Sequence, residues 1–317
     1  MASNPRPMAA ILCGPTASGK SDLALQLAKL LPIEIVSADS RQVYRHLDVG
    51  TAKPTPAERD AVPHHLVDFL GLEETYSAAR FAADANALCA AVRARGRLPL
   101  VVGGAGFYLQ VLRHGLFEAP WSDARLREVR SELATWNTAA IQAELERRDP
   151  SRAAVIHAHD HYRLARALEI CIASDSSVTA LTAARRAAPS RFATCRLQLP
   201  RATLHERIAT RAHSMLTGGW IEEVQALLAA GTDASVPGLH ALGYPHVIAY
   251  LEGRMTRDRV EECIVRDTRR FGRHQETWFR KSEDALELVA GAADNAAVLA
   301  AEWRELLPGT DMATGAA

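Results

Sequence analysis

Short apolar runs and helically spaced apolar residues alternate along the first third of the chain. Runs of strand length occupy residues 8–13, 33–37 and 97–102, and a shorter strand is expected within 62–69. Helical spacing follows in segments that cover 21–31, 78–95 and the stretch ending at His114. Chains that alternate strands with helices form a parallel sheet covered on both faces. The pattern therefore predicts an α/β fold with a three-layer core.

The pattern changes near Pro120, where the strand signal stops. Charged helical stretches replace it, at 123–135, 138–147, 161–173 and 179–186. A strand pattern returns at 193–199, and helices follow at 201–216, 221–230, 246–252 and 257–279. We therefore expect an inserted all-helical domain at residues 122–190, within a core formed by residues 1–121 and 191–317.

Composition and charge are those of a globular protein with one large domain or two moderate ones. Of the 317 residues, 48% are hydrophobic and 23% are charged. Lys plus Arg and Asp plus Glu both number 37, so any basic surface for nucleic acid must be local. The five cysteines form no C-x-x-C pair, and no apolar stretch has signal-peptide or transmembrane length. We expect a cytoplasmic protein with reduced thiols and no membrane partner.

A glycine-rich loop follows the first predicted strand and precedes the first predicted helix. It reads G-x-x-x-x-G-K-[ST], the P-loop pattern typical of ATP and other nucleotide binding. Its backbone N–H groups and the helix N-terminus bind phosphate, Lys20 adds a positive charge, and the Ser21 hydroxyl can ligate Mg²⁺. The loop residues are Gly14, Pro15, Thr16, Ala17, Ser18, Gly19, Lys20 and Ser21. The loop predicts a phosphate site, and it does not say which phosphate is bound.

An acidic residue follows the second predicted strand. Asp39 stands at the carboxyl end of that strand, the edge at which α/β sheets bind ligands. Its carboxylate could bind Mg²⁺ or accept a proton from a nucleophile, and the alternative is a structural or helix-capping role. The adjacent side chains have hydrogen-bonding groups that suit a base edge; they are Ser40, Arg41 and Gln42.

A second glycine turn, residues 103–108, follows the strand at 97–102. Its N–H groups could face an anion, or it could be a plain strand-to-helix turn. A nucleotide kinase or ATPase normally has an acid at the end of such a strand, and here the strand runs into Gly103 and Gly104. This difference weakens the nucleotide hypothesis.

Basic residues recur at helical spacing in three places. Polar residues spaced by three from His157 to Glu169 form either a phosphate-contacting face or a solvated one. Arg211 could reach a phosphate bidentately. The predicted helix at 257–279 interleaves arginines with aromatic residues, which suits RNA but is also typical of an amphipathic helix.

Taken together, the ordered motifs resemble those of the tRNA dimethylallyltransferases, also called tRNA isopentenyltransferases. The matching segments cover residues 11 to 281 and are far more specific than the P-loop alone. They are the P-loop, Asp39–Tyr44, Asp48–Pro54, Pro63–Leu66, Tyr76–Ala78, Val102–Gly104, His157–Glu169, Arg211 with Met215, Gly243–Tyr244, Thr268–Arg270 and Gln275–Trp278.

The resemblance implies a reaction and assigns roles. Such enzymes transfer a dimethylallyl group from dimethylallyl diphosphate to N6 of the adenosine at position 37, 3′ of the anticodon, in tRNAs reading codons that begin with U. Asp39 would accept the N6 proton, while Lys20, Arg211 and Mg²⁺ on Ser21 would stabilise the departing diphosphate. The P-loop and Ala105 would hold the diphosphate, so its occupant would be an isoprenoid rather than a nucleotide.

The resemblance also implies how tRNA is bound. The partner is the anticodon stem-loop, with the target base unstacked into a channel and the inserted domain gripping the stem. We expect a monomer. The residues aligned with tRNA contacts are Asp39, Ser40, Arg41, Gln42, Arg163, Arg166, His240, Gly243, Tyr244, Arg273, His274, Gln275, Trp278 and Arg280.

Three positions depart from the family pattern. Ala105 replaces a threonine whose hydroxyl contacts the diphosphate, His240 replaces an arginine, and Arg273-His274 replaces Lys-Arg. The histidines make part of the expected positive charge pH-dependent. Two alternatives therefore remain: a P-loop nucleotide or small-molecule kinase, and a weakly active tRNA-binding homologue that lacks the threonine hydroxyl.

Overall fold

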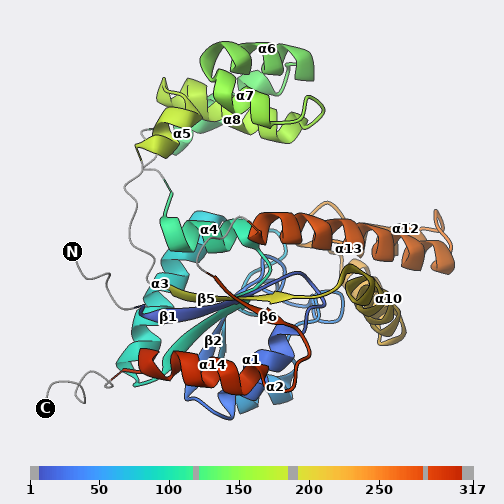
Figure 1. Ribbon diagram of the computed structural model, residues 1–317. Coiled ribbons are helices and arrows are strands. Elements are labelled where there is room, and N and C mark those ends of the chain that lie inside the picture. The colour runs from blue at the N-terminus through green and yellow to red at the C-terminus, as the bar shows by residue number, and fades with distance from the viewer. Residues whose placement is uncertain (1–6, 117–120, 185–191, 281–284, 309–317) are drawn as a thin grey trace, which may run out of the picture. The chain divides into compact units, whose positions relative to one another are not determined.

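The computed structural model describes residues 7–116, 121–184, 192–280 and 285–308 (Figure 1). The chain divides into two compact units. One comprises Met1–Arg113 and Pro189–Ala317, and the other comprises His114–Ala188. The assignment of residues 122–190 as an inserted tRNA-binding domain stays a prediction.

The first unit is built on a six-stranded parallel sheet with the order β3-β2-β4-β1-β5-β6. Its central strands are fully buried and apolar except at Glu34 and Ser37, as expected of a sheet covered on both faces. The strands are β1 (Ala9–Cys13), β2 (Ile33–Ala38), β3 (His64–His65), β4 (Leu98–Gly103), β5 (Phe192–Gln198) and β6 (Ala285–Val289).

Helices cover both faces of this sheet, and two hydrophobic cores result. Figure 1 shows α1 and α14 on one face and α3, α4 and α13 on the other. The helices of this unit are α1 (Lys20–Ala28), α2 (Pro56–Ala61), α3 (Ala78–Ala94), α4 (Gly106–His114), α10 (Arg201–Thr217), α11 (Trp220–Ala229), α12 (Tyr244–Leu251), α13 (Arg257–Phe279) and α14 (Asn295–Trp303).

The register brings three strand ends together. Cys13 of β1 pairs with Gly103 of β4, which pairs in turn with Ala38 of β2. Only glycine fits at position 103, because an added Cβ would lie 2.1 Å from the carbonyl oxygen of Ala38. The P-loop, Asp39 and the second glycine turn therefore start at neighbouring points of one sheet edge.

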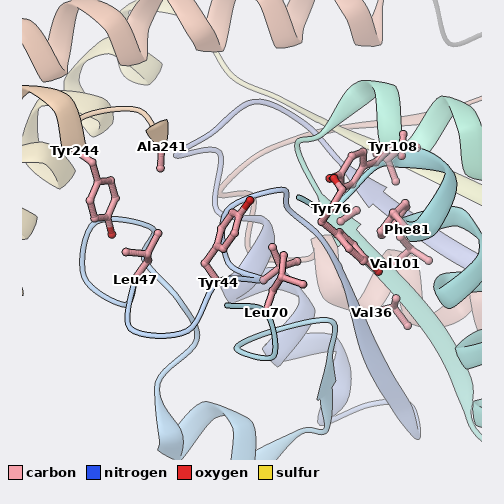
Figure 2. Close-up of a cluster of buried hydrophobic side chains, with 14 of the residues drawn as sticks. Val36, Tyr44, Leu47, Leu70, Tyr76, Phe81, Val101, Tyr108, Ala241 and Tyr244 are labelled. Carbon is pink, nitrogen blue, oxygen red and sulfur yellow. The ribbon is translucent and has the colours of Figure 1, made fainter. Parts of the chain in front are cut away.

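A group of buried tyrosines packs below that edge (Figure 2). The Tyr108 hydroxyl donates to the carbonyl oxygen of Tyr76 at 2.6 Å, and the Tyr44 hydroxyl donates to that of Glu74 at 2.9 Å. Tyr108 also stacks on Phe81, with ring centroids 4.7 Å apart. These bonds satisfy the polar ends of buried rings, so the loops above rest on a rigid apolar base.

The second unit is helical throughout its described residues, 121–184. It comprises α5 (Asp123–Leu133), α6 (Thr138–Arg148), α7 (Pro150–Val155), α8 (His161–Ser174) and α9 (Val178–Ala183). Each helix begins after a Ser, Asn or Asp whose side chain accepts a backbone N–H bond. Leucine, isoleucine and valine side chains from four of these helices form a separate core.

Five elements differ from the sequence-based expectation. The strand expected within 62–69 is reduced to the two residues of β3, because the chain turns through left-handed conformations at Leu66 and Asp68. Helices α2, α7 and α14 and strand β6 were not expected. Strand β6 is a short edge strand, and most of its side chains are exposed, so its apolar pattern is weak.

In the parts of the chain that the structure describes, no helix combines the length and apolarity needed to cross a membrane.

A buried carboxylate holds the start of β2. The side chain of Glu34 is 5% exposed and accepts two bonds from Arg95, at 2.6 and 2.9 Å. His65 Nε2 lies 2.7 Å from the same carboxylate. Hydrogen bonding to Arg95 lowers the pKa of Glu34 to about 2, against the cost of burying the charge. A carboxylate with a lowered folded-state pKa stabilises the fold above its unfolded pKa, and this contribution is lost as the pH falls through the folded value.

We expect Glu34→Gln to lower the unfolding temperature by about 2–4 °C at pH 7. The difference from the wild type should narrow as the pH falls from about 4.5 toward 2, because Glu34 binds a proton first in the unfolded chain and, near its folded-state pKa of about 2, in the folded protein as well. Thermal melts followed by circular dichroism across this pH range measure both effects. Glu73→Gln, at an exposed position, is the control. A difference that stays constant with pH would contradict the assigned ion pair.

Candidate active site

The P-loop wraps around the amino group of its own lysine. Gly14 and Gly19 adopt positive φ angles of 155° and 85°, and Ala17 also lies in the left-handed region, at 60°. The Lys20 ammonium donates to the carbonyl oxygens of Pro15 and Gly14 at 2.7 and 3.0 Å. The loop leads directly into α1, and the first N–H groups of a helix lack partners within the helix and therefore bind anions.

Burial makes the charge on Lys20 costly. Desolvation and the nearby Arg211 lower the pKa of Lys20 to about 8, while Cys13 and Asp39 oppose the shift. Lys20 therefore remains mostly protonated at pH 7. Burial also lowers the pKa of Arg211, and the charges of Asp39 and Asp22 oppose this shift. Two desolvated cations beside a nest of N–H groups form a strong site for a multiply charged anion.

Asp39 opens the turn that follows β2. Its Oδ1 accepts hydrogen bonds from the backbone N–H groups of Arg41, at 2.8 Å, and Gln42, at 3.3 Å. Its other oxygen, Oδ2, makes no hydrogen bond with any described residue. Asp39 is half-buried and lines the same cavity as Lys20. One oxygen thus orients the carboxylate, and the other is available to a ligand.

The second glycine turn lies beside these residues. Its Ala105 N–H donates to the carbonyl oxygen of Ala38 at 3.2 Å, so this group is used within the protein. An added Cβ at Gly104 would lie 2.3 Å from Gln275, and one at Gly106 would lie 2.4 Å from Trp278. The glycines allow α13 to approach the turn closely.

Gln275 of α13 bridges the two glycine loops. Its Oε1 accepts a 2.8 Å bond from the Thr16 N–H, and its Nε2 donates at 2.9 Å to the carbonyl oxygen of Gly104. Gln275 is 7% exposed. Its alignment with tRNA contacts implied an RNA-binding role, and the structure assigns its amide to the P-loop and the neighbouring turn.

Arg207 is a cation at the site for which we predicted no role from sequence. It lies one helical turn before Arg211 on α10, and its Nη1 is 3.6 Å from the position a Cβ would take on Gly19. It therefore lies at the N-terminal end of α1, where it adds to the positive potential of the P-loop. The i,i+4 spacing of the two arginines was the available sequence signal.

One cavity of about 1410 Å³ connects these groups. Its polar base includes the P-loop, Asp39 and Arg211, and its walls include Ser40, Arg41, Gln42, His240 and His274. Three partly exposed aromatic side chains also line it, namely Phe107, Phe271 and Trp278. Phe107 meets Trp278 edge to face at 6.4 Å. The cavity thus combines an anion site with flat apolar surfaces suited to stacking.

Other residues aligned with tRNA contacts lie away from this cavity. Gly243 and Tyr244 are buried, with Tyr244 packed edge to face on Trp220. Arg273 and Arg280 are exposed on α13 and at its end. Arg163 and Arg166 belong to α8 of the second unit, where they pair with Asp160 and Glu169, respectively.

The donor set around the P-loop fits Mg²⁺ bound largely by substrate. Mg²⁺ keeps several waters and typically binds through one or two protein oxygens together with phosphate oxygens. Ser21 provides a hydroxyl at the start of α1, and the second oxygen of Asp39 is available in the same cavity. No group of three or more His, Cys, Asp or Glu side chains in the described ranges forms a complete metal site.

Comparison with known proteins shows the family to which the chain is similar. A family model described as IPP transferase matches residues 42–282. The tRNA dimethylallyltransferase of Methylococcus capsulatus is 44% identical, over 90% of this chain and 93% of the relative. That of an Anaeromyxobacter species is 46% identical, over 90% and 95%.

Solved structures have the same fold. The tRNA isopentenylpyrophosphate transferase of Bacillus halodurans is 31% identical, with a TM-score of 0.69 over 95% of this chain and 98% of that one. A eukaryotic dimethylallyltransferase that acts on tRNA has a TM-score of 0.77 over 92% of this chain and 77% of its own, at 24% identity. The second likeness concerns the fold alone.

Replacing the bridging amide tests how the site is held. We expect Gln275→Leu to reduce the free energy of unfolding by about 1–3 kcal/mol, because the Thr16 N–H and the Gly104 carbonyl lose their partner. Urea denaturation measures the change. Gln225→Leu places the same substitution at an exposed position of α11 and should stay within about 0.5 kcal/mol of the wild type. Equal effects of the two substitutions would show that the bridge contributes nothing.

Proposed function

The chain belongs to the IPP transferase family, and on that premise we propose that it is a tRNA dimethylallyltransferase. It transfers the dimethylallyl group of dimethylallyl diphosphate to N6 of the adenosine at position 37, 3′ of the anticodon, in tRNAs reading codons that begin with U. The observation that carries the proposal is the convergence of an anion-binding P-loop and the Asp39 carboxylate in one cavity.

The diphosphate binds at the P-loop. Backbone N–H groups at the start of α1 and the cations of Lys20, Arg207 and Arg211 surround it. Charge accumulates on the diphosphate as the allylic C–O bond breaks, so these groups stabilise the transition state more than the ground state. Ser21 would hold Mg²⁺ together with oxygens of the substrate, and the ion would supply further positive charge at the leaving group.

Asp39 acts on the acceptor side. The adenosine N6 forms the new C–N bond at the allylic carbon, the C–O bond to the diphosphate breaks, and the N6 proton passes to a carboxylate oxygen of Asp39. The bond from the Arg41 N–H to Oδ1 sets the orientation of the carboxylate, so Oδ2 is the acceptor. Because no water needs activation, the chemistry has no use for an acid at the end of β4.

Recognition of the RNA uses stacking and charge. The target base leaves its stack and enters the cavity, where Phe107, Phe271 and Trp278 offer aromatic faces. Arg273 and Arg280 on the core unit, and Arg163 and Arg166 on the helical unit, contact phosphates. The protein works as a cytoplasmic monomer.

Product analysis tests the function. The protein is incubated with unmodified tRNA, dimethylallyl diphosphate and Mg²⁺, and the digested nucleosides are analysed by mass spectrometry. We expect N6-(dimethylallyl)adenosine in tRNAs that read codons beginning with U. A parallel incubation contains ATP and nucleosides; phosphoryl transfer there, without any alkylated adenosine in the first incubation, would instead identify a kinase.

Asp39→Asn tests the proton acceptor. The amide oxygen can still accept the Arg41 N–H bond, but the side chain can no longer take a proton. We expect kcat to fall about 10²- to 10⁴-fold, the usual contribution of a general base, with tRNA affinity changed less than about twofold. Single-turnover kinetics and filter binding measure the two quantities. Unchanged turnover would make Asp39 a structural residue.

Ala105→Thr tests the departure from the family pattern. The hydroxyl would add a hydrogen-bond donor at the cavity wall, and we expect kcat to rise about tenfold. Ala105→Val adds similar bulk without the hydroxyl and is the control. If both variants have the same kcat, packing rather than hydrogen bonding decides the effect, and the wild-type site does not need a hydroxyl at position 105.

A further inference from the structure

A carboxylate outside the cavity holds one of its loops. Glu223 of α11 receives hydrogen bonds from three consecutive backbone N–H groups. The Asp48 and Val49 N–H groups lie 2.7 Å from its Oε2, and the Gly50 N–H lies 3.4 Å from its Oε1. Three N–H groups that converge on one anion form a nest, which only an acceptor can fill. Glu223 occupies the nest that the loop at 48–50 presents.

The surroundings of Glu223 keep its carboxylate in this position. The Tyr244 hydroxyl donates to Oε1 at 2.7 Å, and Figure 2 shows Tyr244 reaching toward the segment that carries Leu47. The fully buried Trp220 packs against Gly50, where an added Cβ would lie 2.1 Å from its ring nitrogen. The loop can therefore approach α11 only with glycine at position 50. The glycine does not set the orientation of the loop; the hydrogen bonds to Glu223 do.

The loop in turn holds the turn that carries Asp39. Gln42 Nε2 donates to the carbonyl oxygens of Thr51 and Ala52, at 3.3 and 3.0 Å. The Gln42 N–H donates to Asp39 Oδ1, the bond that helps to orient the carboxylate. A continuous set of hydrogen bonds thus joins Glu223 to Asp39 through a loop that itself lines the cavity.

We propose that Glu223 is a positioning residue for the proposed transfer reaction. It fixes the loop at residues 48–52, and through Gln42 it sets the Asp39 carboxylate against the acceptor nitrogen. It touches neither substrate, since it does not line the cavity. The diphosphate site at the P-loop does not depend on it. Loss of Glu223 therefore lowers the rate of transfer and leaves donor binding unchanged.

Glu223→Gln tests this inference, which rests on the proposed function. The amide presents an NH₂ group to N–H donors, so at least one bond of the nest is lost. We expect kcat to fall about 10- to 100-fold, the cost of a small misplacement, while the KM for dimethylallyl diphosphate stays within about twofold. Glu222→Gln, at the exposed neighbouring position, should match the wild type. Wild-type kcat in Glu223→Gln would overturn the inference, as would equal losses in kcat and donor binding.

Hydrogen exchange separates this inference from the proposed function, because it needs no substrate. We expect the peptide covering residues 48–52 to exchange faster in Glu223→Gln, with peptides of β1 and β4 unchanged. Tyr244→Phe removes one donor and leaves the Asp48 and Val49 bonds, so its kcat should fall less than that of Glu223→Gln. If this peptide exchanges at the same rate in Glu223→Gln as in the wild type, the loop does not need the carboxylate. If the wild type transfers no dimethylallyl group but the peptide exchanges faster in Glu223→Gln, the proposed function is wrong and the structural role of Glu223 stands.

Discussion

The amide of Gln275 is the contact on which the site depends. The P-loop and the second glycine turn leave neighbouring strands, and each presents one backbone group to the same side chain. Gln275 bonds to the Thr16 N–H and to the Gly104 carbonyl, so each of these groups has a side-chain partner from α13. The long helix α13 is thereby fixed against both loops, and the cavity between them acquires a wall of defined position.

The functional groups and their supports come from different parts of the chain. Lys20, Asp39 and Ala105 lie within the first half of the first unit, on loops that follow β1, β2 and β4. Arg211, which lines the cavity, and Glu223, which holds one of its loops, come from helices after residue 200. Burial and the repulsion from Arg211 lower the pKa of Lys20 to about 8. A bound diphosphate would neutralise the closely spaced positive charges of the two side chains.

Much of this arrangement follows from local sequence signals. The P-loop pattern predicted a phosphate site because its chemistry is local: one turn, one lysine and one helix N-terminus. The parallel sheet and the carboxyl-edge location of Asp39 follow from alternating apolar runs, since parallel strands end at a common edge. The exposed edge strand β6 escaped prediction because its side chains are mostly exposed and leave little pattern. The only sequence signal for Arg207 was its position four residues before Arg211 on the same helix.

The sequence by itself determined most of the element types, the P-loop and the family to which the chain belongs. The tertiary structure decided which oxygen of Asp39 is available, that Gln275 serves the P-loop, and that Glu223 holds the loop at 48–50. The physical reason is distance along the chain: Thr16 and Gln275 are separated by 259 positions. Hydrophobic periodicity reports which face of an element is buried, but it does not report which buried polar groups meet. Such pairs exist only once the helices are packed on the sheet.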